Sequence, residues 1–345
     1  MATGSGIKMS LALWHWHIEI SSKCTLKCPR CPRLEVSDGL INAELDLEFF
    51  KSNFTEQFIH DNVEKITFCG DDGDPIYARD LISVIEYIKG IKPVKFSIVT
   101  NGSYKSDIWW TALAGQLDSN DTIHFSLDGW DQQSNERYRV NSNWDSILAG
   151  IAVLRKNSEV FMTWDAIAFL FNQDNISHMR EMASKLGFDS FQLTKSTKFS
   201  KIYNSYPEID SLQPRDEFIS DNFRFQREIT NLSDRIESTI GYATNLALFK
   251  DIKVINEVLP LCNVGNKGLF INSQGNFFPC CWVANRYSHN KDWESISKKF
   301  NLKENSLSDV VKDNYWNKEF RSFTWTECKT KCSSSVVTEA YATEW

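Results

Sequence analysis

The chain has 345 residues, of which 42% are hydrophobic and 13% aromatic, enough for one large domain or two smaller ones. Its formal net charge is -7 and its pI about 5.5, and an acidic surface repels phosphate backbones, so we do not expect a nucleic-acid polymer as a partner. The first residues do not resemble a secretory signal peptide, and no apolar run reaches the length of a membrane span, which favours a cytoplasmic protein without a membrane partner. In that compartment we expect the nine cysteines to be metal ligands or catalytic thiols rather than disulfides.

The first two-thirds of the chain alternates strand and helix patterns. Periodicity and turn signals predict, in chain order, strand 15–20, helix 45–59, strand 63–68, helix 79–90 closed by Gly90, strand 94–100, helix 106–117, strand 122–127, helix 144–156, strand 160–171, helix 175–187 capped by Asn175, and strand 188–194. This alternation predicts an α/β fold, a partial (β/α)6 TIM-like barrel with a parallel sheet. Such a sheet places its chemistry at the carboxyl ends of the strands.

The predicted elements divide the chain into five segments. These are a flexible N-terminus (1–12), the partial barrel (13–200), a polar linker with bridging helices (201–258), a small α+β domain (259–335) and a C-terminal tail (336–345).

Three cysteines follow the first predicted strand directly. Cys24, Cys28 and Cys31 form a C-x3-C-x2-C loop at the end of the sheet where an active site is expected. Three thiolates suit a four-iron cluster that leaves one iron open, whereas a structural zinc site needs a fourth ligand. His15 and His17 are close in sequence and keep zinc as an alternative, but the spacing and the strand-end position favour the cluster.

With this loop the chain resembles the radical S-adenosylmethionine (radical SAM) enzymes. The stretch "FCGDDGDP" (68–75) is similar to the glycine-rich motif of that family, whose backbone meets the SAM amino group, and the resemblance places Gly70, Gly73, Asp74 and Pro75 at that cofactor. The open iron of the family binds the SAM amino and carboxylate groups, and cleavage of SAM gives a 5′-deoxyadenosyl radical that takes a hydrogen atom from the substrate.

Further segments continue the resemblance over residues 16–195. "SIVTNG" (97–102) and "HFSLDG" (124–129) are similar to the third and fourth strand segments, which places Asn101, Ser126 and Asp128 among the cofactor-binding residues. The segment 136–151 resembles the one that follows, in which Arg139 would pair with the SAM carboxylate; a solvent-exposed arginine is the alternative. Arg30 stands where the family usually has an aromatic residue, and its guanidinium would stack on adenine instead.

A second group of cysteines lies near the C-terminus. Cys262 and Cys280 enclose the spacing C-x12-G-x4-C around Gly275, and Cys328 and Cys332 follow later. This pattern resembles the SPASM and Twitch domains of radical SAM enzymes, and the number of cysteines implies the shorter Twitch form with one auxiliary four-iron cluster. Zinc held by four cysteines is the alternative. "GLFINSQGNFFPC" predicts a hairpin that turns at Ser-Gln-Gly-Asn.

Two cysteines remain outside both sets. Cys69 ends the second predicted strand, and Cys281 adjoins Cys280, where it would alternatively act as a cluster ligand. Either is a candidate catalytic thiol that returns a hydrogen atom to a substrate radical, or else an inert buried thiol.

The resemblance implies a SAM-cleaving enzyme that receives electrons from flavodoxin or ferredoxin. We expect it to oxidise a small molecule or a peptide side chain, with the auxiliary cluster as electron acceptor. A radical epimerase, a nucleotide- or base-modifying radical SAM enzyme and a non-catalytic iron–sulfur or zinc protein are the alternatives.

Overall fold

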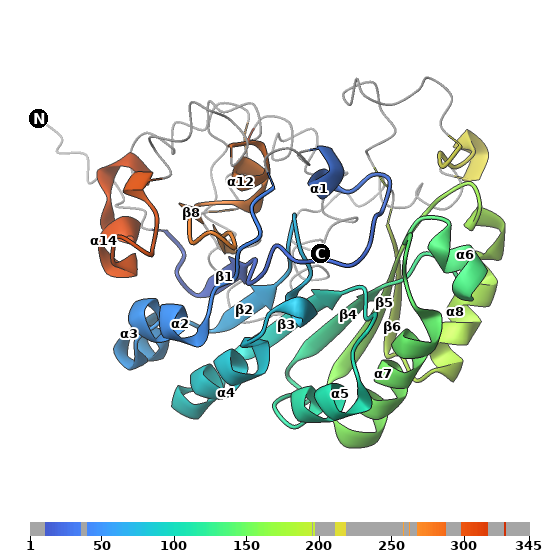
Figure 1. Ribbon diagram of the computed structural model, residues 1–345, viewed down its shortest axis with the longest axis horizontal. Coiled ribbons are helices and arrows are strands. Elements are labelled where there is room, and N and C mark those ends of the chain that lie inside the picture. The colour runs from blue at the N-terminus through green and yellow to red at the C-terminus, as the bar shows by residue number, and fades with distance from the viewer. Residues whose placement is uncertain are drawn as a thin grey trace, which may run out of the picture.

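A single eight-stranded sheet organises the protein, in the strand order β6-β5-β4-β3-β2-β1-β7-β8 (Figure 1). The computed structural model describes residues 11–35, 40–194, 196, 211–218, 258, 262, 268–287, 298–316 and 328. The strands are β1 His15–Ile18, β2 Lys65–Phe68, β3 Lys95–Thr100, β4 Thr122–Ser126, β5 Phe161–Ile167, β6 Ser190–Thr194, β7 Leu269–Ile271 and β8 Phe277–Phe278. The six strands predicted between residues 15 and 194 are all present and all parallel, which confirms the partial barrel.

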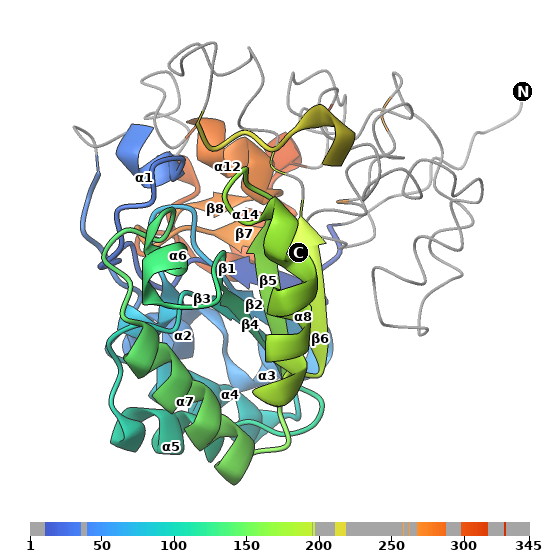
Figure 2. The ribbon, with the colours of Figure 1, turned by 90° about the vertical axis from the view of Figure 1, so that its right-hand side faces the viewer.

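Helices connect these strands as the alternating pattern requires. They are α1 Pro32–Glu35, α2 Leu47–Asn53, α3 Glu56–Asn62, α4 Leu81–Ile91, α5 Asp107–Ala114, α6 Gln132–Glu136, α7 Trp144–Asn157, α8 Ile176–Lys185, α12 Cys281–Tyr287 and α14 Leu307–Lys312, with short 3-10 turns at η2 Pro75–Tyr77 and η3 Gln173–Asn175. In both ribbon views α1 and α12 lie on the side of the molecule opposite α5 and α7 (Figures 1 and 2).

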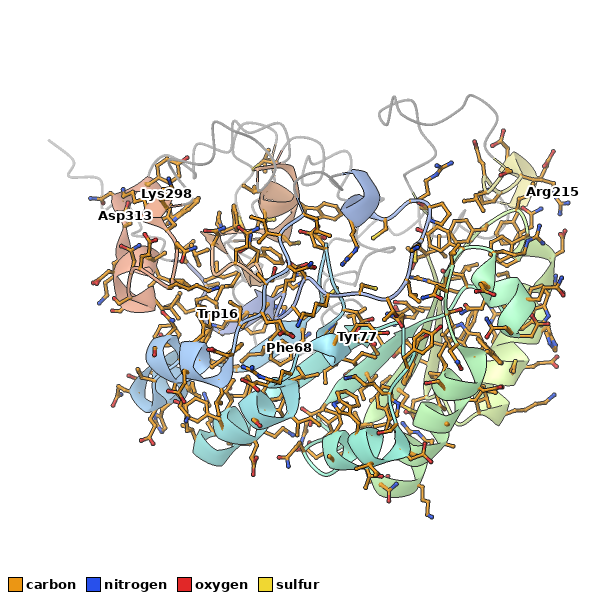
Figure 3. The ribbon with its side chains drawn as sticks, in the orientation of Figure 1. Trp16, Phe68, Tyr77, Arg215, Lys298 and Asp313 are labelled. Carbon is orange, nitrogen blue, oxygen red and sulfur yellow. The ribbon has the colours of Figure 1, made fainter. Side chains whose placement is uncertain are left out.

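The core lies between the sheet and the helices that follow its strands. Alternate side chains of the strands point into this layer, so Phe68 stacks on Phe96 with ring centroids 5.7 Å apart, and Phe50 of α2 meets Phe68 edge-on. Trp16 and Phe68 are fully buried here (Figure 3). Residues next to them in the strands, such as His17 and Cys69, therefore lie on the other face of the sheet.

Four local predictions were wrong in detail. The single helix predicted over 45–59 is two helices, because Thr55 adopts an extended backbone and accepts a hydrogen bond from the backbone N–H of Phe58 as the N-cap of α3. Gly90 does not close α4, which continues to Ile91 and ends at the extended Lys92. Asn175 stands at the N-cap of α8 but makes no capping side-chain hydrogen bond.

The strand predicted over 160–171 ends early, at Ile167. Asn172 causes this, because its Nδ2 donates to the carbonyls of Ile167 and Asp128 while its Oδ1 accepts from the backbone N–H of Phe169. The chain turns away from the sheet there in spite of its apolar sequence.

The predicted C-terminal hairpin exists and extends the barrel sheet. Strand β7 pairs antiparallel with β8, as predicted, and parallel with β1, with Trp16 opposite Leu269 and Ile18 opposite Ile271. Figure 2 shows the three strands side by side. Segments about 250 residues apart in sequence are thus neighbours, and the second cysteine region packs onto the strand that leads to the first.

Candidate active site

The first three cysteines lie in one group of packed apolar side chains beyond the end of β1. Cys28 is buried with Leu26, Tyr138 and Phe169, and the half-buried Cys24 and Cys31 pack against this cluster. The backbone N–H of Cys31 donates to the carbonyl of Cys28 at 3.0 Å, which forms a tight turn between the last two cysteines.

Burial controls the charge state of these thiols. It raises the pKa of Cys24 to about 12, with Asp74 adding to the effect, and the pKa of Cys28 to about 11, against the opposing charge of Arg139. Thiols in these surroundings become thiolates only when positive charge such as iron is bound to them.

The three cysteines fit an iron–sulfur cluster better than one zinc ion. In the part of the chain that the structure describes, no three His, Cys, Asp or Glu side chains converge to hold a single metal ion. A four-iron cluster takes one thiolate per iron, so its ligands need not converge on a point. His15 Nε2 lies 2.9 Å from Thr67 Oγ1 and His17 Nε2 lies 3.1 Å from the carbonyl oxygen of Cys69, so these ring nitrogens are hydrogen-bonded within the sheet.

The glycine-rich loop after β2 packs directly on the segment that precedes Cys24. A Cβ added to Gly73 would lie 1.9 Å from the carbonyl oxygen of Ser21, so only glycine fits this backbone-to-backbone contact. The backbone N–H of Asp74 donates to the carbonyl of Lys23 at 2.9 Å, and Arg33 Nη1 donates to the carbonyls of Ser22 and Asp72. The predicted glycine motif and the cysteine loop therefore form one unit.

Asp74 stabilises this unit from inside. Its Oδ1 accepts hydrogen bonds from Thr100 Oγ1 (2.8 Å) and the backbone N–H of Ile76 (3.1 Å), and its Oδ2 accepts from the backbone and side chain of Asn101. Burial raises the pKa of Asp74 to about 6, although these hydrogen bonds oppose the shift. Pro75 begins η2 directly after it.

Asn101 connects the end of β3 to the cysteine loop. Its Nδ2 lies 3.8 Å from Cys24 Sγ, and its Oδ1 accepts from the backbone N–H of Ser103. Tyr77, labelled in Figure 3, adds a second link, because its hydroxyl is hydrogen-bonded to Thr25 Oγ1 (2.7 Å) and to the carbonyl of Ser103 (3.0 Å). The ends of β2 and β3 are thereby fixed around the cysteine loop.

Arg139 and Asp128 form a buried ion pair beside Cys28. Arg139 Nε donates to Asp128 Oδ2 at 2.6 Å, with side chains 16% and 0% exposed, so the solvent-exposed alternative for this arginine is wrong. Burial favours the neutral forms of both groups and raises the pKa of Asp128, whereas the charges of Asp128 and Cys28 outweigh burial at Arg139 and raise its pKa. Contact of Arg139 with a SAM carboxylate stays a prediction, as does adenine stacking by Arg30, which is 9% exposed.

The inner face of β4 and β5 carries a polar pair that the sequence did not reveal. His124 Nδ1 lies 2.9 Å from Asp165 Oδ2, and both side chains are largely buried. Ser126, 5% exposed, stands opposite Asp165 in the strand register. The second oxygen, Asp165 Oδ1, is buried without a hydrogen-bond partner among the residues described here, which leaves an acceptor for a bound molecule.

The structure describes the two cysteines outside both sets, Cys69 and Cys281. Cys69 lies on the inner face, level with Val99 and His124 in the strand pairing. Desolvation raises its pKa well above the usual value, and the charges of Asp71 and Asp74 add to this shift. Cys281 is half-buried and begins α12.

The second cysteine set packs against the main core. Cys262, Cys280, Cys281 and Cys328 are half-buried around it, whereas Cys332 lies outside the described residues. Gly275 has a positive φ of 88°, and its N–H donates to the carbonyl of Asn272, so the turn falls at 272–275, one residue earlier than predicted.

Two family models match the chain. Residues 18–186 match the radical SAM superfamily, and residues 262–333 match the SPASM iron-sulfur cluster-binding domain. The chain therefore combines a radical SAM domain with a SPASM domain.

The radical SAM domain contains Cys24, Cys28, Cys31 and the glycine-rich loop, and the SPASM domain contains all five C-terminal cysteines. A radical SAM domain implies a four-iron cluster with SAM, and a SPASM domain implies auxiliary iron–sulfur clusters, which confirms the predicted cofactors. The assignment of each ligand residue stays a prediction.

Solved structures of proteins with bound S-adenosylmethionine share this fold. SuiB of Streptococcus suis bound to S-adenosylmethionine is 16% identical with a TM-score of 0.59, over 94% of this chain and 71% of that one. The native protein anSMEcpe with bound AdoMet and the Cp18Cys peptide is 15% identical with a TM-score of 0.60, over 95% of this chain and 88% of that one. No curated protein sequence matched the chain significantly.

Sequence reasoning missed three residues of the radical SAM domain: Glu19, Arg33 and Asp165. Glu19 directly follows the first strand and faces the glycine-rich loop, so an acidic residue at the end of a buried strand was the available signal. The partner of Asp165 is 41 residues away, and no local spacing reveals such a pair.

Membrane-spanning helices are not found in the described segments, where no helix combines the necessary length and apolar character.

Proposed function

We propose that this radical SAM SPASM enzyme oxidises a peptide side chain or a small molecule, with SAM as the source of the radical and a SPASM cluster as electron acceptor. One observation carries the proposal: the three thiols, the glycine-rich loop and the SPASM hairpin meet at the carboxyl end of β1. Cleavage of bound SAM supplies a 5′-deoxyadenosyl radical that removes a hydrogen atom from the substrate.

The residues of the radical SAM domain bind and orient the cofactors in this proposal. Cys24, Cys28 and Cys31 would hold the cluster, which would leave one iron without a protein ligand for SAM. The backbone of residues 70–75 faces the amino group, and Asn101, Ser126 and the Asp128–Arg139 pair line the rest of the SAM site. Asn101, Ser126 and Asp128 are buried, which would keep water away from the bound cofactor.

Oxidation requires that the substrate lose a proton and an electron in addition to the hydrogen atom. The pair His124–Asp165 on the inner face is our candidate for the proton acceptor. Asp165 Oδ1 is buried and has no hydrogen-bond partner among the described residues, while Oδ2 is hydrogen-bonded to His124. Cys262, Cys280, Cys328 and Cys332 hold the auxiliary cluster that takes the electron, and flavodoxin or ferredoxin reduces the first cluster.

Solved structures with a similar fold favour a peptide substrate. SuiB has been solved with its precursor peptide SuiA, and anSMEcpe with the Cp18Cys peptide. A common fold at this low identity supports the substrate class without naming the side chain that reacts.

The test is SAM cleavage by the purified protein. After anaerobic reconstitution with iron and sulfide and reduction with dithionite, we expect formation of 5′-deoxyadenosine, and none from protein loaded with zinc alone. A protein that takes up iron and sulfide but forms no 5′-deoxyadenosine would contradict the proposal. Added peptides that increase 5′-deoxyadenosine formation and lose two mass units would identify oxidation substrates.

Epimerisation is the second candidate, and the state of Cys69 is the observation that favours it. Its half-buried thiol has a raised pKa and keeps its proton, as a hydrogen-atom donor to a substrate radical must. If the enzyme is an epimerase, Cys69→Ser or Cys281→Ser will lose product while 5′-deoxyadenosine still forms. If it is an oxidase that uses neither thiol, the product will persist in both variants.

A further inference from the structure

Glu19 lies between the glycine-rich loop of the radical SAM domain and the hairpin of the SPASM domain. It follows β1 directly and is 2% exposed. Its Oε1 accepts hydrogen bonds from the backbone N–H groups of Asp72 (2.6 Å) and Gly73 (3.3 Å), and its Oε2 accepts one from the backbone N–H of Ser273 (3.4 Å). The two oxygens of one carboxylate therefore contact two domains.

The backbone around Glu19 fixes the position of this carboxylate. Its own N–H donates to the carbonyl of Ile271 at 2.9 Å, which continues the β1–β7 pairing up to the hairpin turn. A Cβ on Gly70 would lie 2.8 Å from Glu19 Oε1, so the loop backbone closes over the carboxylate. The side chain fills the space between loop and turn and has little freedom to leave it.

The hairpin turn that Glu19 contacts is itself fixed by hydrogen bonds to Asn272. Asn272 Oδ1 accepts from the backbone N–H groups of Gln274 and Asn276, and the carbonyl of Asn272 accepts from Gly275. Strand β8 then leads to Cys280 and to α12. A shift of the turn therefore moves the backbone that carries two of the SPASM cysteines.

We propose that Glu19 is a positioning residue that couples the two domains: it holds the loop at Asp72–Gly73 and the turn at Ser273 in one arrangement, so that SAM bound at the loop orders the SPASM hairpin. The inference rests on the proposed SAM site at residues 70–75. Coupling between two sites is reciprocal, so a change in the turn must alter SAM affinity by the same factor by which SAM alters the turn.

Two variants remove the coupling from opposite sides. Glu19→Gln keeps the shape, but its amide nitrogen carries two hydrogens and accepts no hydrogen bond, whereas either oxygen of the carboxyl group can accept one. The variant therefore cannot accept from both the loop and the turn. Ser273→Pro removes the N–H on the hairpin side, and proline suits the second position of the 272–275 turn. Glu48→Gln is the matched control, since Glu48 is 76% exposed on α2.

Hydrogen–deuterium exchange of the reconstituted protein, with and without SAM, tests the proposal. In wild type we expect SAM to slow exchange in residues 70–75 and also in 268–278. In Glu19→Gln and in Ser273→Pro the hairpin effect should disappear, and the dissociation constant of SAM should rise about fivefold or more. Both changes break the same link. The double variant should therefore bind SAM no more weakly than the single variant with the higher dissociation constant.

The possible failures are distinguishable. If SAM does not protect residues 70–75 in wild type, the proposed SAM site itself is wrong. If SAM protects the loop and the hairpin in Glu19→Gln as in wild type, or if Glu48→Gln weakens SAM binding equally, the coupling role of Glu19 is refuted. A purely structural role would lower stability without changing the SAM-dependent difference in the hairpin.

Discussion

Replacing Gly73 with alanine tests how the glycine-rich loop is held against the cysteine loop. The added Cβ would lie 1.9 Å from the carbonyl oxygen of Ser21 and 2.6 Å from Cα and the carbonyl carbon of Ser22. All three are backbone atoms, so no side chain can rotate away. To reach even the 3.0 Å that real Cβ atoms respect, the two backbones must separate by about 1 Å.

That separation has a cost in stability and in function. Overpacking of this kind destabilises by about 1–3 kcal/mol, and here it also weakens the hydrogen bonds from Gly73 to Glu19 and from Asp74 to Lys23. We therefore expect Gly73→Ala to lose about 2–3 kcal/mol of unfolding free energy. Since the moved segment leads directly into Cys24, we also expect at least a tenfold loss of SAM affinity.

Anaerobic urea unfolding of the reconstituted protein, with equilibrium SAM binding, measures both effects. Gly90→Ala is the control, because a Cβ there meets nothing within 4 Å and the residue lies inside α4; this change should stabilise by about 0.5–1 kcal/mol. If Gly73→Ala unfolds and binds SAM as wild type does, the close packing of the two loops is refuted.

Two further predictions concern buried charges. Arg139→Met should lower the unfolding free energy by about 3–5 kcal/mol, because it leaves the fully buried Asp128 without its ion-pair partner. Urea unfolding measures this loss, and adding Asp128→Asn to the variant should restore part of it. An unchanged unfolding midpoint in Arg139→Met would contradict the importance of the ion pair. Burial, with the charges of Asp72 and Asp71, raises the pKa of Glu19 from 4.5 to about 8. Between these values the folded state keeps a proton that the unfolded state releases, so stability should fall as pH rises, by at most about 1.4 kcal/mol per pH unit. Unfolding midpoints from pH 5 to 8 should show a shallower fall in Glu19→Gln, and identical slopes would refute the raised pKa.

The order of strands and the first cysteine loop were predictable because their signals are local. Each strand shows an apolar run next to a helical pattern, and Cys24, Cys28 and Cys31 lie within eight residues of one another. Element ends were less predictable, since single polar side chains decide them. Thr55 starts a new helix in the middle of an apolar periodicity, and Asn172 ends a strand that the apolar sequence would continue.

Long-range pairings could not be read from the sequence. The hairpin was predicted, but its parallel pairing with β1 joins segments about 250 residues apart. The sequence of Leu269–Ile271 does not indicate which strand it pairs with. Glu19 contacts Asp72 and Ser273, which are 53 and 254 residues away. The predicted site residues were found through a family resemblance, whereas the residues that hold them in place follow only from the three-dimensional contacts.

The most direct measurement is electron–nuclear double resonance of the reduced first cluster with SAM labelled at its amino nitrogen. Cys262 and Cys280, the proposed auxiliary ligands, are replaced by alanine so that the first cluster gives the signal. We expect a nitrogen coupling to iron that is lost in Cys28→Ala. A loaded and reduced cluster that shows no coupling to labelled SAM, or protein that binds zinc and no iron at Cys24, Cys28 and Cys31, would contradict the account.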